Sequence, residues 1–127
     1  MRGRYCTLIA CVIAELLLIG CGLNSHSERP TNPEQLASNG QMLYVEYCAE
    51  CHQTDGTGWS TLYPRLAGNP VVTLHDPEPI IKTVLYGQGS MMPFREKLNS
   101  QQVAEILTYV RSSWGNDALP VSRRQVH

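Results

Sequence analysis

The sequence Cys-Ala-Glu-Cys-His at residues 48–52 constrains this chain more than any other feature. Two thiols three residues apart at a helix end lie on nearly one face, where both can add as thioethers to the vinyl groups of one porphyrin. The same spacing of two cysteines also occurs in redox disulfides, in one half of a zinc site and in structural cystines. A redox motif is expected beside a β-α-β pattern and zinc needs a second ligand pair, and neither follows the motif. The motif therefore predicts one covalent c-type haem on Cys48 and Cys51, with His52 as the proximal iron ligand.

The N-terminal segment is typical of an export signal. Two arginines precede a largely apolar run over residues 5–19, which is too short to span a bilayer comfortably. The run leads into Leu-Ile-Gly-Cys at residues 18–21, which resembles the lipobox of bacterial lipoproteins. We therefore expect residues 1–20 to be a lipoprotein-type signal peptide and Cys21 to carry lipid on the periplasmic side of a membrane. An uncleaved N-terminal anchor is the alternative.

Length and charge limit what the rest of the chain can be. The chain has 127 residues, which suits one small domain and excludes a multidomain enzyme. Without residues 1–20, eight basic and ten acidic side chains remain, so the formal charge is −2 and no strong field attracts nucleic acid. We expect a polar tether over residues 21–32, a folded domain over residues 33–117 and a C-terminal tail over residues 118–127.

Helix start and stop signals divide the domain into three helical segments. The first begins at Pro33, the second runs from the Asp-Pro at 76–77 to Gly87, and the third follows a cap at Asn99 and ends at Gly115. Apolar side chains recur at helical spacing in these segments: Leu36, Leu43, Tyr44 and Tyr47; Ile80, Ile81, Val84 and Leu85; Val103, Ile106, Leu107, Val110 and Trp114. No segment shows sustained two-residue alternation, so the expected fold class is all-α.

Over residues 32–117 the chain resembles the class I cytochrome c family. In that family the first and last helices cross where a glycine allows close approach beside an aromatic side chain, and Gly40 and Tyr44 match these positions. Ile106 and Tyr109 match the facing positions on the last helix. The resemblance implies a small cytochrome c domain in which the N- and C-terminal helices cross around one covalently bound haem.

Other segments extend the resemblance. The family has a proline whose carbonyl accepts a hydrogen bond from the ligating histidine, and Pro64, twelve residues after His52, matches it. Residues 66–69 resemble the family's loop over the haem. Residues 92–94 and 104–116 look most like the last domain of multihaem cytochrome subunits of membrane-bound alcohol and sugar-acid dehydrogenases, although this chain has one haem motif. A role as a dehydrogenase subunit therefore stays open.

The sixth iron ligand has four candidates in the sequence. Met92 is favoured because Pro93 restricts it to an extended conformation and the Gly-rich run before it can pass close to a porphyrin. The family's ligand also directly precedes a proline, and Met91 is the alternative. His75 stands ahead of a helix cap and is interpreted as a solvated loop residue, and Met42 is interpreted as a core side chain of the first helix.

Together these residues predict a one-electron carrier rather than an enzyme, with both axial ligands bound to the haem iron in both oxidation states. The main alternative is a haem protein with an open distal site that binds a peroxide or a gas, and a thiol redox protein is a third. The expected partners are redox proteins, with a periplasmic or membrane dehydrogenase as donor and an oxidase or another cytochrome as acceptor. The membrane would be reached through the lipid anchor.

Overall fold

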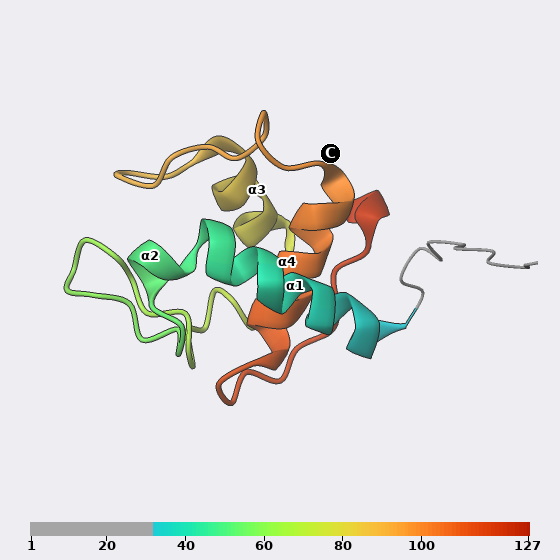
Figure 1. Cartoon of the computed structure of the whole chain (residues 1–127), viewed down its shortest axis with the longest axis horizontal. Helices are drawn as coiled ribbons and strands as arrows, with labels where there is room; N and C mark the ends of the chain where they lie inside the picture. Colours follow the sequence, from blue (N-terminus) through green and yellow to red (C-terminus); the bar gives the residue numbers. More distant parts are fainter. Residues whose placement is uncertain (1–31) are drawn as a thin grey trace, which may run out of the picture.

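A computed structural model describes residues 32–127, so the predicted signal peptide, Cys21 and nearly all of the predicted tether lie outside the described residues. The described part contains helices and no β-strand, with two isolated bridges in its loops. This confirms the prediction of an all-α fold. In chain order the elements are α1 (Pro33–Tyr47), α2 (Ala49–His52), α3 (Glu78–Tyr86), α4 (Ser100–Ser112) and the short 3-10 helix η1 (Arg123–Gln125) (Figure 1).

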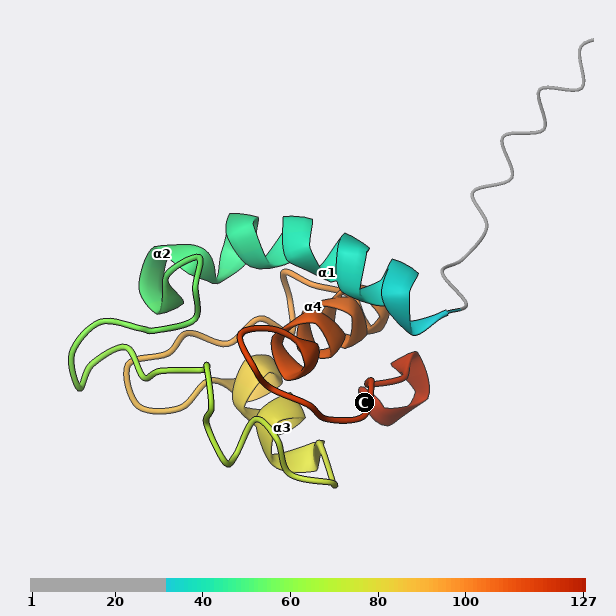
Figure 2. The same ribbon diagram turned by 90° about the horizontal axis from the view of Figure 1, so that it is seen from below.

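The crossing of α1 and α4 forms the centre of the fold (Figures 1 and 2). Asn32 caps α1 by accepting a 2.7 Å hydrogen bond from the backbone N–H of Gln35. Gly40 lies at the crossing, because a Cβ at this position would collide with the backbone carbonyl of Glu105 and with the Cβ of Tyr109 on α4. Any side chain at Gly40 would therefore push the two helices apart, and the crossing expected from the sequence is present.

The last long helix begins as predicted but ends earlier. Asn99 caps α4 through a capping box, and the helix stops at Ser112. The prediction that it would continue to Gly115, with Trp114 on its apolar stripe, is therefore wrong. Trp114 has a φ of 54°, which turns the chain out of the helix. Its ring packs instead against the ring of Tyr44, with 5.1 Å between the ring centroids.

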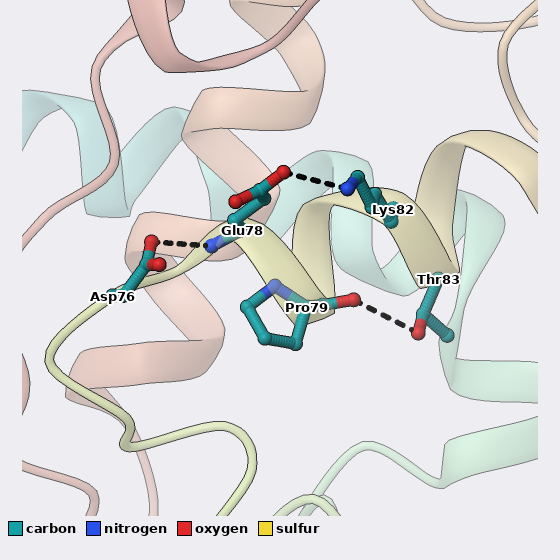
Figure 3. A network of polar contacts seen from close by, with 5 residues as sticks. All are labelled: Asp76, Glu78, Pro79, Lys82 and Thr83. Atoms are coloured by element: carbon teal, nitrogen blue, oxygen red, sulfur yellow. Dashed lines mark hydrogen bonds and ion pairs between the residues drawn. The ribbon is translucent and has the colours of Figure 1, made fainter.

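Local polar contacts define α3 and its start (Figure 3). The carboxylate of Asp76 accepts a 3.0 Å hydrogen bond from the N–H of Glu78, and the side chain of Glu78 pairs with Lys82 one turn later. The hydroxyl of Thr83 donates to the carbonyl oxygen of Pro79. These contacts are exposed and fix the outer face of α3, while its apolar face is buried in the core, as its spacing predicted. The buried residues of α3 are Ile80, Ile81 and Leu85.

The core extends past residue 117 because residues 118–127 fold back onto α4 (Figure 2). Val121 is fully buried, and its backbone N–H and carbonyl both bond to the hydroxyl of Thr108. Val126 is buried as well. The guanidinium of Arg111, also fully buried, donates to three backbone carbonyls, one of them in this C-terminal segment. Burial lowers the pKa of Arg111 from its ordinary value.

Candidate haem site

The thiol pair lies on a single turn of helix that continues from the end of α1. Cys48 caps α1 through a 2.9 Å hydrogen bond from its N–H to the carbonyl of Tyr44, and it precedes α2. The N–H of His52 donates at 2.9 Å to the carbonyl of Cys48, which holds the motif in one turn. Cys48 and Cys51 are both free thiols and partly buried. The arrangement presents both sulfur atoms and the imidazole from one short segment.

These side chains border a cavity of about 660 Å³. A neighbouring cavity of about 200 Å³ reaches into the apolar core, and both are lined by Cys48, His52, Pro64 and Met91. The smaller cavity is lined largely by apolar side chains: Tyr44, Leu66, Val71, Val72, Ile80, Val84, Ile106, Leu107 and Val110. Two thiols, an imidazole and thioether sulfurs around a largely apolar space are the donor set that a covalently attached porphyrin requires. The residues present therefore fit a c-type haem.

His52 is held by a hydrogen bond on the far side of its ring. Its Nδ1 lies 2.9 Å from the carbonyl oxygen of Pro64, and because a carbonyl only accepts, Nδ1 carries the proton. The lone pair of the neutral ring is then on Nε2, the nitrogen free to bind a metal. The backbone carbonyl of His52 also accepts a 2.9 Å hydrogen bond from Gly58. This is the contact between His52 and Pro64 that the family resemblance implies.

The two methionines that follow the Gly-rich run are placed differently. Met91 is partly buried against the core, and its backbone N–H and carbonyl bond to Gln88. Met92 is 54% exposed, and its sulfur lies 3.4 Å from the ammonium nitrogen of Lys97. Both line the larger cavity, but only Met91 lines the smaller one as well. The structure thus brings both candidate sixth ligands to the cavity that holds His52.

The other two sulfur and nitrogen candidates lie away from the cavities. His75 is exposed in the loop before α3, as expected. Met42 is 68% exposed, so the interpretation of this residue as a core side chain is wrong. The reason is helical geometry, since Met42 lies two residues from the buried Gly40 and two from the buried Tyr44, which places it on the opposite face of α1.

Burial disfavours the thiolate form of Cys48. It raises the pKa of Cys48 to about 12, and the nearby Cys51 adds to the shift. Cysteines that act in thiol–disulfide exchange have a lowered pKa and are accessible. The raised pKa of Cys48 therefore argues against the thiol redox interpretation.

An all-α fold with crossed terminal helices, a Cys-x-x-Cys-His turn and a carbonyl-bonded histidine defines a class I c-type cytochrome domain. The sequence family described as cytochrome c oxidase, cbb3-type, subunit III matches residues 35–110, and the chain belongs to this family. The chain therefore contains a c-type cytochrome domain, a class of domain that transfers electrons through a covalently bound haem. No helix within residues 32–127 has the length and apolar character needed to cross a membrane.

Similar proteins include cytochrome subunits of much larger size. The chain is 34% identical over 106 residues to the cytochrome c subunit of a quinone alcohol dehydrogenase from Gluconacetobacter polyoxogenes, which covers 70% of this chain and 23% of that protein. It is 39% identical over 94 residues to the gluconate 2-dehydrogenase cytochrome c subunit of Pantoea cypripedii, and this match covers 65% of this chain and 21% of that protein. Cytochrome c-552 of Thermus thermophilus is 29% identical over 94 residues, covering 62% of this chain and 70% of that protein. The chain thus spans less than a quarter of the two dehydrogenase subunits.

Proposed function

We propose that this chain is a one-electron carrier with one haem, bound through thioethers to Cys48 and Cys51, with His52 and Met92 as axial ligands. The hydrogen bond of 2.9 Å between His52 Nδ1 and the Pro64 carbonyl carries the proposal, because it fixes the ring and leaves Nε2 free to bind a haem iron. Met91 is the alternative sixth ligand. Haem iron supplies a reversible ferric–ferrous couple.

The chain's own residues would make each transfer easy by keeping the site rigid and dry. The bond to Pro64 fixes the orientation of the His52 imidazole and strengthens it as a donor. A thioether ligand favours the ferrous state and raises the reduction potential. The apolar side chains that line the smaller cavity would keep water away from a bound porphyrin. A site that changes little between oxidation states suits a carrier and leaves no open position for a substrate.

The setting we propose is the periplasmic side of a bacterial membrane. The apolar run over residues 5–19 and the lipobox ending at Cys21 support export and lipid anchoring. We propose residues 1–20 as signal peptide, 21–32 as tether and 33–117 as the domain expected from the sequence, with residues 118–127 as a C-terminal segment packed onto it. Relatives named as cytochrome subunits of alcohol and gluconate dehydrogenases favour a membrane dehydrogenase as electron donor. An oxidase or another cytochrome would be the acceptor.

The exposed position of Met92 favours one other candidate, a haem with an open distal site. Ferric and ferrous absorption spectra of the exported protein separate the two. We expect a low-spin spectrum with a weak sulfur-to-iron charge-transfer band at the red end, and no binding of carbon monoxide to the ferrous form. A high-spin spectrum with ready carbon monoxide binding would favour the open site. As a control, the Cys48→Ser, Cys51→Ser double variant should release its haem on denaturation, and covalent haem in that variant would refute the attachment.

A further inference from the structure

Asn116 is a buried amide that joins α4 to the loop beside the haem site. It lies in the turn after α4 and is only 5% exposed. Its side-chain nitrogen donates at 2.7 Å to the carbonyl of Val110 and at 3.1 Å to the carbonyl of Leu66. Its side-chain oxygen accepts at 2.8 Å from the N–H of Gly68. One side chain therefore ties the end of α4 to both sides of the loop around residue 67.

This loop has no regular structure to hold it in place. On its other side, the N–H groups of Leu66 and Ala67 both donate to the carbonyl of Gly56, at 2.8 and 3.0 Å. The loop is thus held between Gly56 and Asn116. Pro64, whose carbonyl accepts the hydrogen bond from His52, stands two residues before Leu66. The position of that carbonyl depends on these two anchors on its C-terminal side and on the backbone bridge between Trp59 and Tyr63 on its N-terminal side.

We propose that Asn116 is the positioning residue of the proximal ligand, acting through Leu66, Gly68 and Pro64 on the bond to His52 Nδ1. This inference rests on the proposed role of His52 as an iron ligand. A carbonyl held against Nδ1–H makes the imidazole a stronger donor, and a stronger donor stabilises the more highly charged ferric iron. Loss of the Asn116 contacts loosens the loop, weakens that bond and raises the reduction potential.

The test compares two holoprotein variants that each lose buried hydrogen bonds of α4. Asn116→Ala removes the contacts to the loop, whereas Thr108→Val removes the contacts of Thr108 to Val121, in the C-terminal segment. In Asn116→Ala, the His52 Nδ1 proton should exchange with solvent at least about tenfold faster, because the loop opens more often when its buried hydrogen bonds are lost. NMR measures this exchange. The midpoint potential should shift upward. Thr108→Val should lower the free energy of unfolding but should alter neither the exchange of the His52 Nδ1 proton nor the midpoint potential.

An Asn116→Ala protein whose proton exchange and potential match those of Thr108→Val would overturn the proposal. If Asn116→Ala does not assemble, exchange in the wild-type holoprotein decides instead. The amide proton of Gly68 and the Nδ1 proton of His52 should then exchange through one shared opening, with similar opening free energies once the different intrinsic exchange rates of the two groups are divided out, and different opening free energies would overturn the proposal. Failure of the proposed haem attachment is distinguishable, because the wild-type protein would then hold no covalent haem at all.

Discussion

The hydroxyl of Tyr44 donates a 2.6 Å hydrogen bond to the carbonyl oxygen of Gln53, the residue that follows His52. Gln53 has a φ of 63°, a left-handed conformation that non-glycine residues seldom adopt. The bond therefore links the last turn of α1 to the strained turn that ends the haem-binding segment. Because the ring of Tyr44 is buried, its pKa is raised and its hydroxyl stays protonated as the donor.

Tyr44→Phe should destabilise the holoprotein by about 1–3 kcal/mol, because the Gln53 carbonyl loses its buried partner while the aromatic packing is kept. Denaturant unfolding measures the change. Tyr86→Phe is the matched control, since the Tyr86 hydroxyl makes one long, exposed contact with Arg95 and its loss should cost little. Equal stabilities of the two variants would show that the bond of Tyr44 contributes nothing.

The turn after the haem-binding segment contains a carboxylate with a lowered pKa. The hydroxyl and backbone N–H of Thr57 donate to Asp55 at 2.7 and 3.1 Å, and these bonds lower the pKa of Asp55. Their contribution to stability is present above the ordinary pKa of an aspartate and is lost as the pH falls through the lowered value. Thr57→Val should raise the pKa of Asp55 toward its ordinary range, as followed by NMR titration of the carboxyl carbon. The control Thr83→Val, at a position in α3, should not change the pKa of Asp55.

Much of the fold could be predicted because caps and helical spacing are local. Asn32, Asn99 and the buried stripe of α4 behave as their sequence contexts indicate. The bond between His52 and Pro64 followed from the family resemblance. Chain order alone could not show that the helix would stop before Trp114, because the packing of that ring on Tyr44 joins residues seventy positions apart.

The buried polar residues were the least visible in the sequence. Arg111 and Asn116 are both almost fully buried, yet arginine and asparagine are usually exposed. Their partners are backbone carbonyls and N–H groups in distant loops. Nearly every residue has these backbone groups, so the pattern of side chains in the sequence does not show which of them will be bonded. Such residues can be found only once the loops that they bind are placed.

The two adjacent methionines can be separated by substitution. Met92→Ala should lower the reduction potential by on the order of 0.1 V, because a thioether ligand favours ferrous iron and axial ligands set haem potentials over about 0.8 V. It should also admit carbon monoxide. Met91→Ala should leave both properties nearly unchanged, since its partly buried side chain packs against the core. The reverse pattern would assign the sixth ligand to Met91.

Lipid attachment at Cys21 predicts how the exported protein distributes between fractions. The wild-type protein should be recovered with membranes, because several acyl chains give stable anchoring where one is marginal. Cys21→Ser should release it to the soluble fraction. Cys11→Ser, within the predicted signal peptide, should leave the distribution unchanged. Soluble wild-type protein that begins at another residue would refute the anchor.

Electron transfer with the physiological donor should depend only weakly on salt. The larger cavity is bordered by charges of both signs, from Glu46, Glu50 and Lys97, and the chain without its signal peptide has a formal charge of −2. Long-range steering is therefore modest, and recognition would rely on exposed apolar side chains such as Leu62 at the cavity. The bimolecular rate of the Cys21→Ser form should fall by less than about threefold between low and physiological ionic strength. Glu50→Gln should not alter this dependence. A steep fall would instead show that a charged patch governs docking.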